Sequence, residues 1–160
     1  FLPVADFSRR RYDLMFEVQV AAPVHLAQLV LPRMRERRQG WILNISSRAA
    51  RHPHLPPNER ATRGGTVYGM CKAALERFTS GLAAEMYTDG VAVNALSPNR
   101  VVPTPGTLFH HLTTEDDPRA EAPAVMAEAA LALCGGDPGR TGRIAYSADL
   151  LTELGIPVPA

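Results

Sequence analysis

The distribution of apolar residues along the chain predicts strands that alternate with helices. Short apolar runs at 41–45 and 91–96 are each followed by polar residues, as expected for strands buried on both faces of a parallel sheet. Between them, residues 67–86 have the length and composition of a helix, and Gly90 ends it. Such alternation indicates parallel βαβ units, in which ligands bind in the crevice at the carboxyl ends of the strands.

The segment before the first strand reads as two helical stretches. Ser8 is a candidate N-cap, and Pro23 is expected to open or kink the second stretch. The basic residues at 33–38 stand just before Gly40, where cations complement the helix dipole. This basic run is therefore expected to be a solvated helix end.

Proline and glycine mark the remaining boundaries. They predict long loops at 48–66 and 97–122, and Thr66 is a candidate cap for the helix that follows the first loop. An alanine-rich helix at 124–133 and a short strand at 143–147 complete the expected elements.

Tyr68 and Lys72 carry the most specific chemical signal. Four residues apart on a helix, they share one face with about 5–6 Å between their Cβ atoms. Moving the pKa of a phenol from about 10 to about 7 requires about 4 kcal/mol, which a cation about 4–5 Å away supplies at an effective dielectric of about 20. Lys72 is therefore expected to lower the pKa of Tyr68. A serine at the end of strand 41–45, Ser46 or Ser47, can orient the same oxygen.

Three blocks of the chain, in order, resemble the short-chain dehydrogenase/reductase family. Residues 41–47 resemble its fifth strand and catalytic serine, Tyr68 and Lys72 its Tyr-x-x-x-Lys pair, and residues 91–98 its sixth strand and nicotinamide loop. The resemblance implies an α/β fold with a Rossmann-like doubly wound parallel sheet. Residues 1–160 would be an incomplete domain with the fifth to seventh strands and flanking helices, lacking the N-terminal half with the Gly-rich cofactor loop.

The resemblance also implies an NAD(P)-dependent oxidoreductase that interconverts an alcohol and a ketone or aldehyde. Tyr68 would exchange the proton, and Ser47 would hold the substrate oxygen. Ser47 is preferred over Ser46 because it directly precedes residues 48–50, which match the start of the family's substrate loop. Lys72 would also bind the nicotinamide ribose. Gln19 falls where the family has a helix asparagine that holds a relay water.

The cofactor-binding residues expected by resemblance are Tyr68 and Lys72 together with Pro98, Asn99, Val101 and Thr104. Thr104 is expected to contact the nicotinamide carboxamide. The cofactor is NAD or NADP, and the residue that selects between them would lie upstream. A homodimer or homotetramer is expected. Two alternatives stay open: a non-catalytic remnant that acts as an assembly partner, and an epimerase or dehydratase that uses the same Tyr/Lys pair.

The composition of the chain mainly argues against certain partners and sites. With 46% hydrophobic and 21% charged residues and a net charge of +1, the sequence gives no reason to expect nucleic acid or a membrane as partner. No apolar run of membrane-spanning length is evident. The two cysteines, Cys71 and Cys134, suit reduced thiols in a cytoplasmic protein. No metal site is expected, since the histidines lack partners at fixed spacing: His52, His54, His110 and His111.

Overall fold

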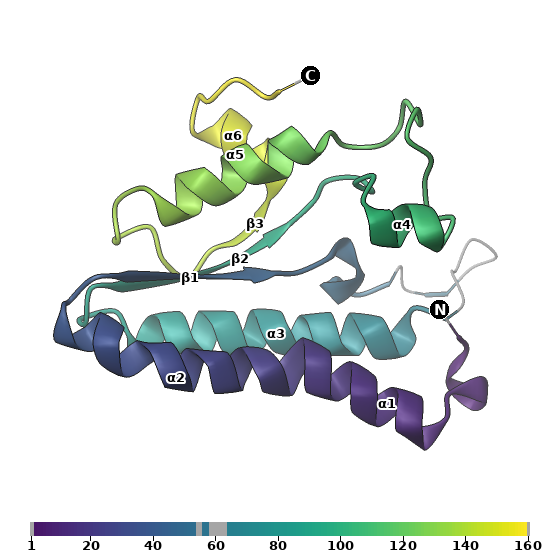
Figure 1. Cartoon of the computed structure of the whole chain (residues 1–160), viewed down its shortest axis with the longest axis horizontal. Coiled ribbons are helices and arrows are strands. Elements are labelled where there is room, and N and C mark those ends of the chain that lie inside the picture. Colours follow the sequence, from purple (N-terminus) through teal and green to yellow (C-terminus); the bar gives the residue numbers. More distant parts are fainter. Residues whose placement is uncertain (1, 54–55, 58–63, 160) are drawn as a thin grey trace.

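The computed structural model describes residues 2–53, 56–57 and 64–159. One three-stranded sheet has the order β1-β2-β3, and helices cover both of its faces (Figure 1). The elements in chain order are η1 (Val4–Asp6), α1 (Arg9–Phe16), η2 (Glu17–Ala21), α2 (Ala22–Glu36), β1 (Gly40–Ile45), η3 (Arg48–Ala50), α3 (Thr66–Glu85), β2 (Val91–Ser97), α4 (Pro105–Phe109), α5 (Pro123–Cys134), β3 (Ile144–Tyr146) and α6 (Ser147–Glu153).

All strand pairs are parallel. β1 pairs with β2 from Gly40 opposite Val91 to Ile45 opposite Leu96, and β3 joins the carboxyl-terminal half of β2. Every residue of β2 is buried, which explains its almost continuous apolar run. The α/β class and the doubly wound parallel sheet expected from the sequence are thereby confirmed.

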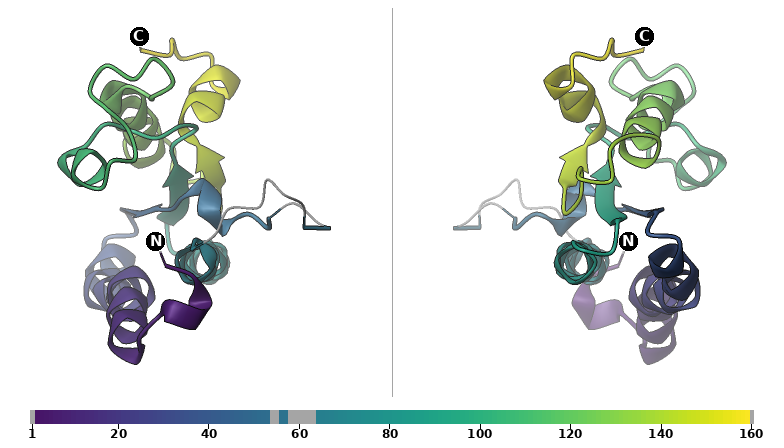
Figure 2. Two further views of the ribbon diagram at one scale, coloured as in Figure 1. Left: turned by 90° about the vertical axis from the view of Figure 1, so that its right-hand side faces the viewer. Right: turned by 90° about the vertical axis from the view of Figure 1, so that its left-hand side faces the viewer.

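Two apolar clusters lie on opposite faces of the sheet. Alternate residues of β2 point to opposite sides, so Leu96 packs with α5 and α6 while Val93 packs with α2 and α3. Figure 2 shows these two layers with the sheet between them. The buried residues of the first cluster are Leu96, Val125, Ala129, Leu133, Ala145, Leu150 and Leu151, and those of the second are Ala27, Leu82, Ala83, Met86, Val91 and Val93.

The structure differs from the expected elements in several places. The loop expected at 97–122 contains the short helix α4, which a reciprocal capping box between Thr104 and Thr107 starts. Helix α6 begins directly after β3. Thr66 is the first residue of α3 and not its cap, because Gly65 occupies the N-cap position without a side-chain hydrogen bond.

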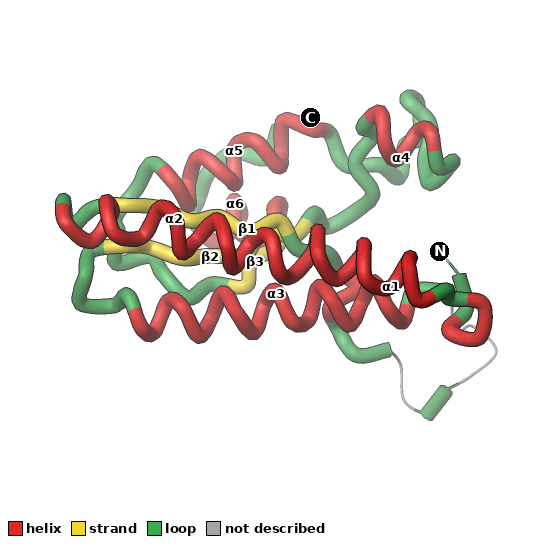
Figure 3. Tube along the Cα trace, turned by 60° about the horizontal axis from the view of Figure 1, so that its bottom comes forward, coloured by secondary structure: helices red, strands yellow, loops and turns green. Residues whose placement is uncertain are grey.

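Residues 9–36 form a continuous helix of 28 residues. The Ser8 side chain accepts a hydrogen bond from the Arg11 N–H and caps it as expected. The helix passes through a π-helical turn, η2, and through Pro23 near the start of α2, and it runs alongside α3 (Figure 3). Pro23 is thus the second residue of α2, in line with its expected place at the opening of that stretch, but the helix does not break there.

By length and composition this helix is apolar enough to cross a membrane, with a mean hydropathy of 1.5 in its best window. The expectation that no segment of that length exists is therefore wrong. An apolar helix near the N-terminus is weak evidence for a membrane span. Its exposed apolar side chains, such as Leu26 (60% exposed) and Leu29 (63%), equally suit contact with another protein surface.

Replacing Leu96 by alanine is expected to lower the free energy of unfolding by about 2–5 kcal/mol, because the cavity left between β2 and helices α5 and α6 cannot fully close. Leu131→Ala is the control, since Leu131 lies on α5 but is 63% exposed. Urea denaturation followed by circular dichroism measures both. Equal losses for the two variants would contradict the placement of the core.

Candidate active site

A row of polar contacts fixes helix α3 along strand β1. Lys72 Nζ donates to the Ile45 carbonyl at 2.7 Å, and Ser46 Oγ donates to Glu76 Oε1 at 2.6 Å. One turn further along, Asn44 Nδ2 donates to Thr79 Oγ1 at 2.9 Å. We call these three contacts the α3–β1 polar row. Because buried polar groups are costly without partners, the row permits only one register of helix against strand.

Tyr68 continues the same helix face beyond Lys72, and Ser47 follows directly after the polar row on the strand side. The Ser47 side chain also caps η3 by accepting from the Ala49 N–H at 3.2 Å. Burial raises the pKa of Tyr68, and the hydrogen bond with the Ser47 side chain partly opposes that rise. The structure thus brings the phenol and the preferred serine together, whereas Ser46 is engaged with Glu76.

The ammonium of Lys72 lies beside the tyrosine ring. Its Nζ is 5.6 Å from the ring centroid of Tyr68, and burial lowers the pKa of Lys72, with an opposing contribution from Cys71. The expected lowering of the Tyr68 pKa by Lys72 is not found in this chain. The reason is that the ammonium is directed at the Ile45 carbonyl, while the phenol has lost water.

Gly69 allows η3 to approach the helix that carries Tyr68. A Cβ at this position would lie 2.5 Å from the Ala49 carbonyl oxygen. Any other residue here would push η3, and Ser47 with it, away from α3. The small residue beside Tyr68 is therefore part of the geometry of the site.

A cavity of about 600 Å³ opens at the carboxyl ends of β1 and β2, a volume within the usual range for small-molecule sites. Four of the expected residues besides Ser47 line it: Tyr68, Pro98, Val101 and Thr104. The complete lining is Ile45, Ser46, Ser47, Arg48, Tyr68, Pro98, Arg100, Val101, Val102, Thr104, Thr107, Leu112, Pro123 and Met126.

Asn99 does not line the cavity. Its Oδ1 accepts a hydrogen bond from the Ala148 N–H at 2.8 Å, at the start of α6. Its own N–H donates to Glu121 Oε2 at 3.0 Å, and the other carboxylate oxygen of this buried glutamate accepts from Ser147 Oγ. Asn99 therefore anchors the loop after β2 to α6, and only its neighbours Pro98 and Arg100 face the cavity.

Gln19 also lies outside the cavity lining. It sits in the π-helical turn η2, which packs against α3. Among the described residues its side chain has no hydrogen-bond partner. Turns of this kind occur frequently at functional sites, so a role for Gln19 in a proton relay stays a proposal.

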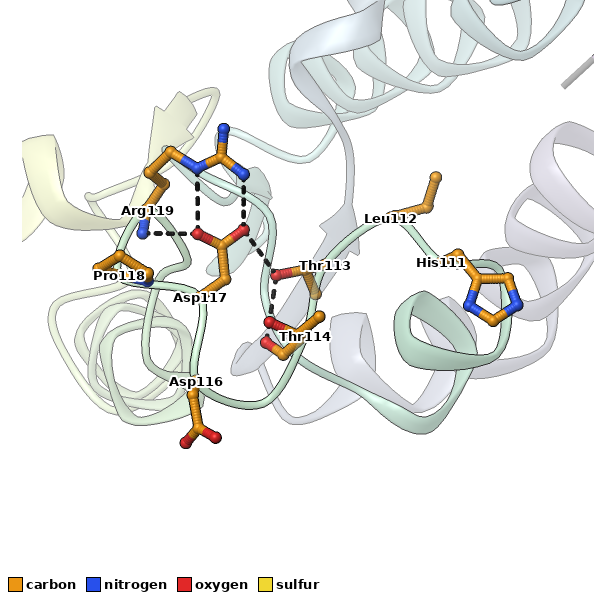
Figure 4. Close-up of a pocket in the computed structure, with 8 residues that line it drawn as sticks. All are labelled: His111, Leu112, Thr113, Thr114, Asp116, Asp117, Pro118 and Arg119. Carbon is orange, nitrogen blue, oxygen red and sulfur yellow. Dashed lines mark hydrogen bonds and ion pairs between the residues drawn. The ribbon is translucent and has the colours of Figure 1, made fainter.

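A second hollow, of about 430 Å³, is formed by residues 111–119. At its centre Asp117 accepts from Arg119 Nε and Nη2 at 3.1 and 3.2 Å, and from Thr113 Oγ1 at 3.4 Å (Figure 4). The Arg119 hydrogen bonds are the largest cause of a lowered pKa at Asp117. Leu112 belongs to both hollows, so this one adjoins the Tyr68 cavity without containing its acid–base residues.

In the described part of the chain, no three or more His, Cys, Asp or Glu side chains are arranged so that they could hold a metal ion. His54 lies outside the described residues. The thiols of Cys71 and Cys134 are free.

Sequence reasoning does not single out Arg48, Arg100 or Glu121. The two arginines directly follow Ser47 and Asn99, but only the fold places both on one cavity. Nothing in the sequence distinguishes the buried Glu121 from the exposed acids before it.

A parallel sheet covered by helices on both faces, with a cavity at the carboxyl ends of its strands, is typical of Rossmann-like doubly wound folds. The family model described as "short chain dehydrogenase" matches residues 1–109. The chain therefore belongs to the short-chain dehydrogenase family.

Similar proteins agree with this assignment. An uncharacterized oxidoreductase of Staphylococcus epidermidis is 31% identical over 104 residues, which are 65% of this chain and 41% of that protein. A solved short chain dehydrogenase/reductase family protein is 32% identical with a TM-score of 0.74, covering 90% of this chain and 59% of its own. The fold of 4-hydroxyisoleucine dehydrogenase complexed with NADH is also similar, at 24% identity and a TM-score of 0.69, covering 91% of this chain and 62% of its own.

The Tyr68 phenol is expected to titrate above its ordinary pKa of about 10. Ser47→Ala should raise that pKa further, because it removes the hydrogen bond that lowers it. Ser46→Ala should leave it unchanged, since Ser46 bonds to Glu76. The pKa is measured from phenolate absorbance as a function of pH, after the absorbance of the Tyr68→Phe variant is subtracted.

The raised pKa of Tyr68 also predicts how the free energy of unfolding changes with pH. The contribution of Tyr68 to the free energy of unfolding is fully present below about pH 10 and is lost as the pH rises through the folded-state pKa. An identical titration in the parent and Ser47→Ala would refute the Ser47–Tyr68 contact.

Proposed function

We propose that this chain carries the acid–base half of an NAD(P)-dependent oxidoreductase that interconverts a small alcohol and its carbonyl compound. The observation that supports this most is the convergence of the Tyr68 phenol and the Ser47 hydroxyl on one cavity, with the Lys72 ammonium beside the phenol ring. The chain spans 41% of the length of the Staphylococcus relative, so the activity is proposed for the whole protein.

In the reductive direction, Tyr68 acts as the general acid. Its raised pKa keeps the phenol protonated near neutral pH, so it can donate a proton to the carbonyl oxygen as that oxygen gains charge. The Ser47 hydroxyl donates a hydrogen bond to the same oxygen and orients it. In the oxidative direction the proton returns from the alcohol to Tyr68.

The cofactor is NAD or NADP, which supplies or accepts the hydride. The residues present fit its nicotinamide end: Pro98, Val101 and Thr104 line the cavity beside Tyr68. Lys72 would hold the nicotinamide ribose, and its buried ammonium would then stand beside Tyr68 as a fixed positive charge. The sequence contains no G-x-G-x-x-G turn for the pyrophosphate. We assign that role to a cofactor-binding half outside residues 1–160.

Tyr68→Phe in the protein that contains this chain is expected to lower kcat by about 10²–10⁴-fold, because the proton donor is lost. Ser47→Ala should cost more turnover than Ser46→Ala. Initial rates with an alcohol and NAD or NADP measure this, and cofactor fluorescence titration checks that binding is retained.

Turnover that is unchanged in Tyr68→Phe would remove the acid–base assignment, whereas a parent protein without turnover would favour a non-catalytic remnant. The alternative chemistry would be favoured if the parent has an epimerase or dehydratase activity, with no net change in the cofactor, and Tyr68→Phe loses it.

The protein is proposed to form a homodimer or homotetramer through the exposed apolar side of helix 9–36. Leu29→Glu should shift the assembly toward monomers, because a carboxylate buried in an apolar interface is costly. Leu131→Glu is the matched control: Leu131 is 63% exposed like Leu29 but lies on α5, on the other face of the sheet. Sedimentation velocity separates the cases, and a monomeric parent would exclude the assembly.

A further inference from the structure

The lining of the Tyr68 cavity has an unbalanced charge. Arg48 and Arg100 both contribute to it, and none of the described residues that line it is acidic. Much of the remaining wall is apolar, including Val101, Leu112 and Met126. The cavity therefore combines a surface for a hydrocarbon with two fixed positive charges.

A hydrogen bond ties the Arg48 side chain to the backbone that leads into Arg100. Arg48 Nη1 donates to the Asn99 carbonyl at 2.9 Å, and that carbonyl belongs to the peptide bond that leads into Arg100. Asn99 is itself fixed by Glu121 and by the start of α6.

Some arginines of the fold pair with carboxylates, whereas the two cavity arginines are exposed and do not pair with a described one. Arg35 pairs with Asp89 at 2.6 Å and Arg119 with Asp117 at 3.1 Å, whereas no ion pair to a described carboxylate is formed by Arg48 or Arg100. Guanidinium groups bind carboxylates and phosphates through paired N–H donors. An anion in the cavity would replace water on these two guanidinium groups.

We propose that the substrate of this site is an anion, a hydroxy or oxo acid whose carboxylate is held by Arg48 and Arg100 while its alcohol or carbonyl reaches Tyr68. The reaction of this anion at Tyr68 rests on the proposed function, but its binding by the arginines does not. The apolar wall takes the carbon chain between the two ends. A phosphate of the cofactor is the other source of negative charge for these arginines. The experiment below distinguishes it from a substrate carboxylate.

The test compares hexanoate with hexanamide, which have the same carbon skeleton and differ in charge. Ligand-observed NMR with the whole protein should give a dissociation constant about 10–100-fold lower for hexanoate, the factor expected for a charge-assisted hydrogen bond. Arg100→Gln should remove the difference, and Arg100→Lys should restore part of it. Arg77→Gln is the control, because Arg77 is exposed on α3 and does not line the cavity.

Equal affinity for hexanoate and hexanamide would overturn the inference. So would loss of hexanoate binding when the whole protein is saturated with NAD or NADP, since the arginines would then be occupied by the cofactor phosphates. The Tyr68→Phe variant keeps the two claims apart: it should bind hexanoate as the parent does. Retained turnover in that variant would remove the proposed reaction and leave the anion site standing.

Discussion

The register of helix α3 on strand β1 is the constraint on which the site depends. Lys72, Glu76 and Thr79 follow one another along one helix face and contact Ile45, Ser46 and Asn44 of or next to β1. Shifting the helix by one residue would leave an ammonium and a carboxylate without partners in a largely buried interface, which costs more than the contacts contribute. Tyr68 meets Ser47 because this row allows no other alignment.

The opposite wall of the cavity is fixed independently. The loop after β2 is attached to α6 through Asn99 and to the buried Glu121, and both attachments lie toward the sheet face that α5 and α6 cover. Two helical layers lie on opposite faces of the sheet (Figure 2). The cavity opens at the carboxyl ends of β1 and β2 and is lined by residues that come from both sides, such as Tyr68 of α3 and Met126 of α5. Neither layer alone supplies both the acid–base residues and the arginines.

Burial, more than charge, sets the state of the acid–base residues in this chain. Loss of water raises the pKa of Tyr68 and lowers that of Lys72, so both changes favour the uncharged forms. A phenol in this state is a proton donor. The positive charges among the residues that line the cavity are those of Arg48 and Arg100.

The sequence by itself determined the order of strands and long helices and the positions of Tyr68, Lys72 and Ser47, because the alternation of short apolar runs with helical segments is a local property. Helix α6, the helix running through Pro23 and the burial of Glu121 were decided by the tertiary structure. Each depends on partners distant in sequence: α6 is capped by Asn99, 49 residues before Ala148, and helix 9–36 packs along α3. The same holds for the electrostatics. A four-residue spacing placed Lys72 beside Tyr68, but only the packed structure turned its ammonium to the Ile45 carbonyl and removed water from the phenol, because desolvation depends on every element that covers a residue.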